Sequence, residues 1–182
     1  MPAETFTNEI IDIDSLPKYE DVLLRKPHRD YLKIICINFS ISFIIFGILI
    51  GLGVTFIDEF KPKAILILSI YLVFMTLIIL LLLASFKKRG YAIRSKDVIY
   101  KSGIIAESTT IVPLNRIQHI ELNEGLFSRI FKLGSLQVFT AGGDSGHLKI
   151  TGIPINEAKN IRDLLLNKLN LTENSVITEN NE

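Results

Sequence analysis

The stretch that decides the fold is IICINFSISFIIFGILIGLGVTFI at residues 34–57, followed after DEFKPK at 58–63 by AILILSIYLVFMTLIILLLLASF at 64–86. The two long segments contain 24 and 23 residues and no Asp, Glu, Lys or Arg. A helix of that length is roughly 35 Å long, enough to cross a hydrocarbon core of about 30 Å. The sequence therefore predicts a hairpin of two transmembrane helices. The alternative, a helical pair buried in a soluble domain, conflicts with the charges that bound both runs.

The basic residues around the two runs predict the orientation of the hairpin. Four of them precede the first run, at Arg25, Lys26, Arg29 and Lys33, and three follow the second, at Lys87, Lys88 and Arg89. The connecting segment 58–63 has only two Lys, beside two acidic residues. Short loops rich in Lys and Arg stay in the cytoplasm. We therefore expect a multi-pass protein of the cytoplasmic (inner) membrane with both termini inside the cell.

The interior of the predicted hairpin carries no charged residue, which gives no sign of a proton relay or an ion pathway. Gly47 and Gly51 form a small-xxx-small step that allows close helix packing. That step serves either the partner helix or a second copy of the chain. Cys36 is the single cysteine, so neither a disulfide framework nor a Cys-rich metal motif is expected.

After residue 86 the chain changes to short β segments separated by turn residues, and the segment Gln118–Asn123 alternates apolar and polar residues. The spacing Leu126, Phe127, Ile130 and Phe131 predicts one or two helical turns at the end of a barrel. GGDSG at 142–146 has the composition of a hairpin loop. A terminal helix follows, with Asn156 as its expected N-cap and an apolar stripe. The predicted strands are Tyr91–Arg94, Val98–Lys101, Ser108–Val112, Gln118–Asn123, Ser135–Ala141 and His147–Thr151.

Charge is unevenly distributed between the parts of the chain. Residues 87–169 contain 13 Lys and Arg against 7 Asp and Glu, a balance of +6. Residues 1–33 are acidic toward their start, which is unlike a signal peptide. The expected organisation is a cytoplasmic extension (1–33), a transmembrane helix (34–57), an outer loop (58–63), a second transmembrane helix (64–86), a β-rich domain (87–169) and a disordered tail (170–182).

Three quoted segments carry a family resemblance: YAIRSKDVIYKSGII from residue 91, TTIVPLNRIQHIELNEGLFSRIFKLGSLQVFTAGG from residue 109, and AKNIRDLL from residue 158. Their order and spacing resemble the bacterial pleckstrin-homology (PH) domain of YdbS-like membrane proteins. The resemblance covers residues 90–169. It implies a mainly β, PH-like domain, with a bent antiparallel sheet or barrel closed by a C-terminal helix. It supplies no catalytic residues, and the phosphoinositide binding of eukaryotic PH domains does not follow from the fold.

Two groups of residues are candidates for contact with other molecules. The first is a basic group expected at the membrane surface, where each cation near anionic lipid contributes on the order of 1 kcal/mol. It comprises Lys87, Lys88, Arg89, Arg94, Lys96 and Lys101. The alternative interpretation is an ordinary topology signal for Lys87, Lys88 and Arg89 and a solvated hairpin for Arg94, Lys96 and Lys101. The second group is a hypothetical partner surface of Arg116, Phe127 and Phe131, which are alternatively turn and core residues.

No pattern in the sequence predicts catalysis or a cofactor. His28, His119 and His147 are scattered without ligand spacing, and no phosphate-loop Lys follows residues 142–146. We therefore expect a non-enzymatic binding module with no metal, cofactor or nucleic acid. Its expected partners are the lipid bilayer and a membrane protein, which includes its own copies. A role in envelope defence against membrane-active peptides and binding of lipid headgroups are the alternatives.

Overall fold

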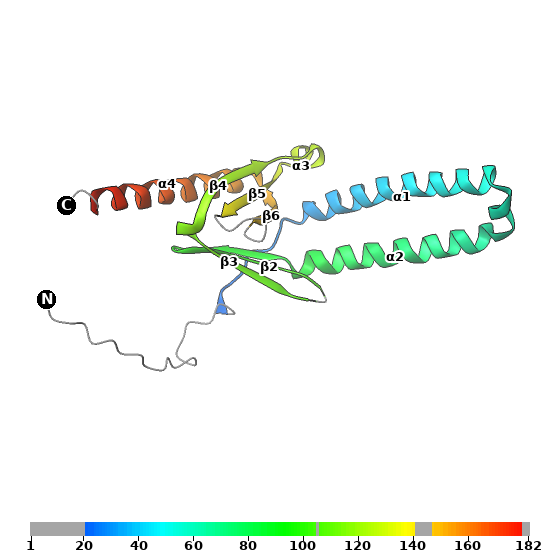
Figure 1. Cartoon of the computed structure of the whole chain (residues 1–182), viewed down its shortest axis with the longest axis horizontal. Coiled ribbons are helices and arrows are strands. Elements are labelled where there is room, and N and C mark those ends of the chain that lie inside the picture. The colour runs from blue at the N-terminus through cyan, green and yellow to red at the C-terminus, as the bar shows by residue number, and fades with distance from the viewer. Residues whose placement is uncertain (1–20, 105, 141–146, 180–182) are drawn as a thin grey trace.

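The computed structural model of the chain describes residues 21–104, 106–140 and 147–179. Two antiparallel helices form a hairpin, and a β-rich domain with a long C-terminal helix lies at its open end (Figure 1). The predicted fold class is thereby confirmed. The hairpin loop predicted at 142–146 and most of the N-terminal extension lie outside the described residues.

Helix α1 spans Asp30–Phe56 and helix α2 spans Ala64–Lys88, joined by the 3-10 helix η3 at Asp58–Lys63. Both helices are long and apolar enough to span a membrane. Their large apolar side chains face outward, and Ile65 and Val73 expose 83% and 71% of their surface. Such a surface is unstable in water but matches the acyl chains of a bilayer.

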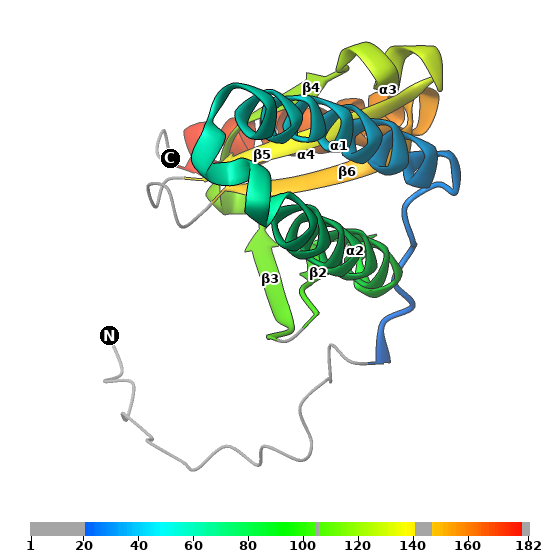
Figure 2. The ribbon, with the colours of Figure 1, turned by 90° about the vertical axis from the view of Figure 1, so that its right-hand side faces the viewer.

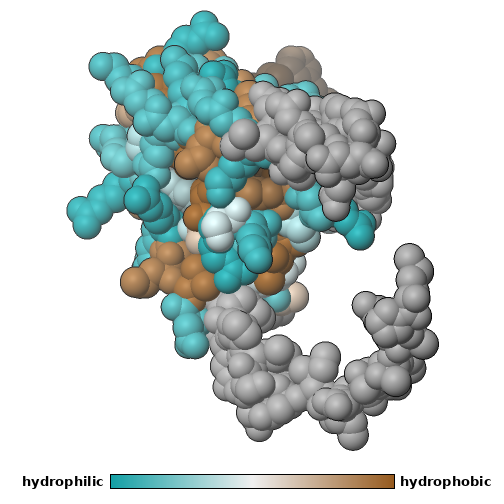
Figure 3. Space-filling model, turned by 90° about the vertical axis from the view of Figure 1, so that its left-hand side faces the viewer, coloured by the Kyte–Doolittle hydropathy of each residue, from teal (hydrophilic) through white to brown (hydrophobic). Residues whose placement is uncertain are grey.

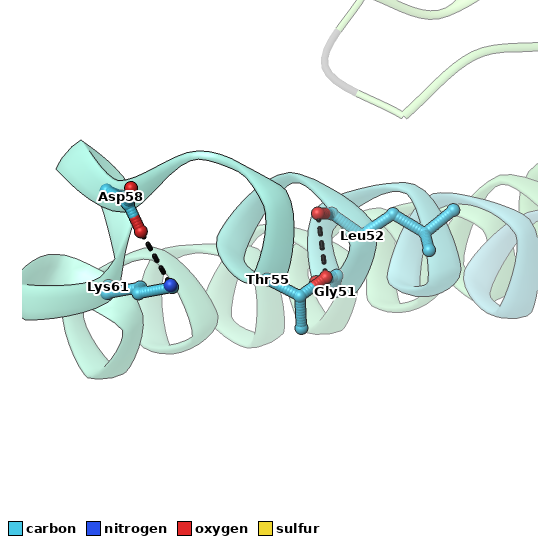
Figure 4. Close-up of polar contacts among 5 residues, drawn as sticks. All are labelled: Gly51, Leu52, Thr55, Asp58 and Lys61. Atoms are coloured by element: carbon cyan, nitrogen blue, oxygen red, sulfur yellow. Dashed lines mark hydrogen bonds and ion pairs between the residues drawn. The ribbon is translucent and has the colours of Figure 1, made fainter.

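Polar groups near the turn of the hairpin are satisfied locally (Figure 4). The Thr55 hydroxyl donates to the carbonyls of Gly51 and Leu52 at 3.1 and 2.9 Å. The Lys61 ammonium lies 2.6 Å from an Asp58 carboxylate oxygen. The last turn of α1 can therefore enter an apolar layer without an unsatisfied hydroxyl.

Gly47 and Gly51 differ in their surroundings. A Cβ at Gly47 would lie 3.5 Å from the Tyr71 hydroxyl, whereas a Cβ at Gly51 would meet no atom within 4 Å. Tyr71 stacks on Phe43 with ring centroids 5.2 Å apart, and its hydroxyl donates to the Phe43 carbonyl. Gly47 thus permits close packing inside the hairpin, and Gly51 does not take part in it.

The domain contains two three-stranded antiparallel sheets, ordered β1-β2-β3 and β4-β5-β6. Short helices join their strands. Strands β1 to β3 are Gly90–Ile93, Asp97–Ser102 and Ser108–Pro113, strands β4 to β6 are Ile117–Asn123, Leu133–Thr140 and Leu148–Pro154, and the connecting helices are η4 at Leu114–Arg116 and α3 at Leu126–Ile130. Each predicted strand is present with boundaries shifted by a few residues at most.

The core of the domain lies between the two sheets and the first half of helix α4, Ile155–Glu179. Val98 and Val112 enter it from the first sheet, Leu136 and Ile150 from the second, and Leu165 from α4. These side chains expose 4% of their surface or less. The apolar stripe of α4 therefore closes the sandwich as predicted.

The ends of α4 differ from the predictions. Asn156 is not the N-cap, because strand β6 runs directly into the helix and the first helical residue is Ile155, whose N–H donates to the Lys132 carbonyl at 3.0 Å. The helix also continues to Glu179, so the backbone of 170–179 is not the irregular tail expected. Extending a helix that packing has already nucleated costs little per residue.

The segment that leads into α1 bridges the two sheets. Arg25 pairs with Tyr91 at the edge of the first sheet through two backbone hydrogen bonds of 2.7 and 2.9 Å. Three residues later, the His28 N–H donates to the Gly152 carbonyl of β6 at 2.8 Å. The chain before the first membrane helix is thus part of the domain.

The second membrane helix joins the domain through one residue. Helix α2 ends at Lys88 and strand β1 begins at Gly90, so only Arg89 separates them. The Arg89 guanidinium hydrogen-bonds to the Thr151 and Ser85 hydroxyls at 3.4 and 3.3 Å. The Arg89 side chain therefore links helix α2 to strand β6, and the connection between α2 and the domain is both short and held by hydrogen bonds.

Candidate functional site

A cleft of 440 Å³ lies between strand β1 and helix α4. Its α4 wall is formed by one helical face, since Glu157, Asn160, Ile161, Leu164 and Lys168 follow three-to-four spacing. The opposite wall comes from β1 and from the segment before α1. It comprises Arg25, Tyr91, Ile93, Arg94 and Ser95.

Glu157 organises the end of the cleft nearer the membrane helices. Its Oε1 accepts from the Arg25 guanidinium at 2.5 Å and from the Tyr91 hydroxyl at 3.3 Å. Burial, and then the negative charge of Glu157, raise the pKa of Tyr91 to about 12. Tyr91 therefore stays a neutral donor throughout the physiological range.

The other end of the cleft is basic. Arg94 makes a two-pronged contact with Asp97 across the β1–β2 turn, at 2.6 and 2.5 Å, and this hydrogen bonding raises the pKa of the Arg94 guanidinium. The Lys168 ammonium donates to the Ser95 carbonyl at 2.9 Å. The lining contains three cations, Arg25, Arg94 and Lys168, and one carboxylate, Glu157. Among the lining residues positive charge is in excess, and Asp97, just outside the lining, offsets part of it at Arg94.

Strand β1 offers backbone groups to the cleft. Tyr91 bonds outward to Arg25, so Ile93, two residues along, directs its N–H and carbonyl to the same outer edge. The cleft combines a strand edge that no described residue pairs at Ile93, the apolar side chains of Ile93, Ile161 and Leu164, and the three cations. Figure 3 views the end of the domain remote from the hairpin and shows hydrophobic residues among hydrophilic ones there. Such a surface suits an extended, acidic and partly apolar segment.

The six residues predicted at the membrane surface do not form one patch. Strand β1 runs away from the membrane helices, which places Arg94 and Lys96 at the far turn, roughly 13 Å along the strand from Gly90. Lys88 and Lys101 lie near the helices and both hold Glu107, each at 2.7 Å. Arg89 contacts Thr151 and Ser85. Lys87 is exposed at the end of α2, as is Lys88.

The residues of the predicted partner surface are also separated. Arg116 is exposed in η4, before β4, whereas α3 follows β4 at its other end, and β4 spans roughly 20 Å. Phe127 and Phe131 are half-buried. Leu126 and Ile130 of the same helix are 77% and 67% exposed, so they do not fill the core as one alternative expected.

Sequence reasoning missed most of the cleft. The sequence does contain one indication of the cleft: the residues of its α4 wall follow helical spacing along one edge of the apolar stripe of that helix. Arg25 could not be found, because its place depends on the pairing of the segment before α1 with Tyr91.

Two of the three histidines, which are far apart in sequence, lie against the same aromatic ring. His119 stacks on one side of Phe139 at 4.0 Å between ring centroids, and His147 meets that ring edge-on at 4.6 Å.

Among the described residues, no group of three or more His, Cys, Asp or Glu side chains could hold a metal ion. In the cleft, the Tyr91 hydroxyl and the Arg25 guanidinium both hydrogen-bond to Glu157, an arrangement that is suited to binding.

Residues 39–169 match the bacterial PH domain family, and the chain belongs to that family. It is a membrane protein, and the matched region includes most of α1 and all of α2, the two helices that are long and apolar enough to cross a bilayer.

Over 79 residues the chain is 29% identical to the UPF0699 transmembrane protein YdbT of Bacillus subtilis (strain 168). This match covers 43% of the chain and only 16% of that larger protein. No solved structure matches the chain.

Proposed function

We propose that the protein is a non-enzymatic interaction module of the cytoplasmic membrane, and that the cleft between β1 and α4 binds an extended acidic segment of another membrane-associated protein. The observation that carries the proposal is the open edge of β1 at Ile93 beside three cations and an apolar helix face. Strand addition supplies backbone hydrogen bonds, and side-chain pockets supply selectivity.

The place of the cleft favours a protein partner over lipid headgroups. The cleft extends from Glu157 to Lys168 on α4, and α4 runs away from the hairpin (Figure 1). Eleven residues of helix correspond to roughly 16 Å. Arg94 and Lys168 are therefore remote from the lipid surface on which headgroups lie. The counts of Lys and Arg around the helices support a cytoplasmic position for this domain.

Anchoring makes a weak site effective. A partner held in the same membrane is concentrated near the cleft, so its apparent affinity exceeds that of the free segment. The joint at Arg89 and the bridging segment 25–28 hold the domain in a fixed place relative to the membrane helices.

The test is site-specific photo-crosslinking in cells, with a benzophenone amino acid at Leu164 in the full-length chain. Matched substitutions on α4 probe the charge of the site: Asn160→Glu places a carboxylate in the cleft, and Asn167→Glu places one on an exposed position outside its lining. We expect a protein adduct at Leu164 that Asn160→Glu abolishes and Asn167→Glu retains. Mass spectrometry identifies the adduct.

Three results would overturn the proposal. One is an adduct with lipid, which would favour headgroup binding. Another is an adduct only with residues 1–20 of the same chain, which would make the cleft an internal contact. The third is a yield at Leu164 no higher than at Leu166, which is exposed on α4 outside the cleft.

A further inference from the structure

Helix α3 exposes two large apolar side chains that no part of the described chain covers. Leu126 and Ile130 are separated by one helical turn, so they share a face, and they expose 77% and 67% of their surface. Their neighbours Phe127 and Phe131 are half-buried. The apolar residues of α3 are therefore divided between a face packed on the protein and a face that is open.

The position of α3 relative to the membrane helices is fixed by a contact with α1. The Lys33 ammonium lies 5.7 Å from the centroid of the Phe131 ring. Lys33 is the last charged residue before the uncharged run that begins at Ile34, so it marks the border of the hydrocarbon layer. Figures 1 and 2 both place α3 beside the first turns of α1. The open face of α3 is thus at the depth of the membrane surface.

We propose that α3 is an interfacial membrane helix, with Leu126 and Ile130 inserted between the lipid headgroups of the leaflet that α1 enters. Short amphipathic elements bury their apolar face roughly 5–10 Å into the boundary between headgroups and acyl chains. Arg129 and Lys132 are exposed on and just after α3, and Lys33, whose ammonium lies 2.6 Å from an Asp30 carboxylate oxygen, is exposed as well, so cations are available to the phosphate layer. Glu124, just before α3, is the one acidic residue of this segment.

Lipid fits this surface better than a protein does. Two exposed side chains on five residues of helix form a patch far smaller than the roughly 800 Å² per partner of a stable protein interface. The lipid, in contrast, is brought to the patch by the covalent connection of the domain to the two membrane helices. Insertion therefore needs no separate encounter.

The inference is tested with the full-length protein reconstituted in vesicles of phosphatidylcholine and phosphatidylglycerol. The native thiol is removed by Cys36→Ser, and a single cysteine at Ile130 carries an environment-sensitive fluorophore. Two quenchers are compared: a nitroxide attached high on the lipid acyl chain, and iodide in the water. The matched control places the label at Ser95, which is exposed at the far turn of the domain.

We expect the label at Ile130 to be quenched by the lipid nitroxide and to show an iodide quenching constant several-fold below that at Ser95. Iodide access equal to that at Ser95 would overturn the inference. Protection from both quenchers would also overturn it, because a protein, including a second copy, would then cover the patch. A label at Leu126 repeats the measurement one turn away, which controls for a disturbance of the helix by the label at Ile130.

Discussion

Tyr31 occupies the space that a side chain at position 152 would need: a Cβ on Gly152 would lie 2.7 Å from Cγ and 2.9 Å from Cβ of Tyr31. Gly152 also has φ +76°, a conformation that other residues rarely adopt. The first turn of a membrane helix is therefore packed against the backbone of β6. This contact joins the hairpin to the second sheet.

Gly152→Ala is expected to lower the free energy of unfolding by about 1–3 kcal/mol, because strain and overlap with Tyr31 act together. The measurement is chemical unfolding of the protein in detergent–lipid micelles. Gly125→Ala is the control, since Gly125 has φ −70° and its Cβ would meet only the Ser128 hydroxyl at 3.9 Å. Equal losses for the two variants would contradict the contact.

Leu165→Ala is expected to cost about 2–5 kcal/mol of stability, because Leu165 of α4 is fully buried in the core of the domain and its truncation leaves a cavity. Its neighbour Leu164 is 46% exposed, so Leu164→Ala should cost less than about 1 kcal/mol. Unfolding curves of the two variants under the same conditions provide the comparison. Similar stabilities would show that α4 does not close the core.

Gly47→Leu is expected to separate the two membrane helices, since the position faces the Tyr71 hydroxyl. Gly51→Leu introduces the same side chain where a Cβ meets no atom within 4 Å, and it should leave the hairpin intact. The spacing of the helices is measured by the distance between spin labels on α1 and α2. A larger distance between α1 and α2 in Gly51→Leu, with no change in Gly47→Leu, would contradict the assignment of Gly47 to the contact between the two helices.

The pair of contacts that Lys101 and Lys88 make with Glu107 should respond to acid. Hydrogen bonds from these two lysines lower the pKa of Glu107 from 4.5 to about 2. A lowered folded-state pKa contributes stability above the unfolded value, and the contribution is lost as the pH falls from about 4.5 to about 2. Glu107→Gln should therefore lower Tm at pH 7 and have no effect near pH 2. Glu124→Gln, at another exposed position, is the control.

The buried Tyr91 hydroxyl should titrate above the ordinary tyrosine value of 10, with a pKa of about 12. Its raised folded-state pKa contributes stability below the unfolded value of 10, and this is lost as the pH rises from about 10 to about 12. The absorbance difference between the wild type and Tyr91→Phe isolates this group. Glu157→Gln should reduce the shift without abolishing it, because burial is its largest cause. A complete return to 10 would contradict that order.

Local patterns predicted the elements of this chain well. The strands are short segments bounded by turn residues, and the two membrane helices follow from uncharged runs of 24 and 23 residues. The start of α4 was misplaced because Asn156 is a good capping residue, yet β6 ends directly in the helix through Pro154 and Ile155. Tertiary connection outweighed the local preference there.

The candidate site was much less predictable. The basic residues were grouped by closeness in sequence, but the β1–β2 hairpin carries Arg94 and Lys101 to opposite ends of the strands. The cleft depends on contacts across more than a hundred residues, such as Arg25 with Glu157. No local spacing encodes a contact of that kind. Which apolar residues of the α3 region are half-buried, Phe127 and Phe131, and which are exposed, Leu126 and Ile130, likewise depends on how α3 meets α1.

Because Arg89 alone separates α2 from β1, a movement of the membrane hairpin is passed on to the domain. Membrane helices adjust their tilt when the thickness of the bilayer changes. Since α2 passes into β1 without a flexible linker, a change in the tilt of α2 turns the cleft and α4 through a similar angle. A change in the thickness or composition of the membrane would therefore also change the direction in which the cleft faces the partner proposed for it.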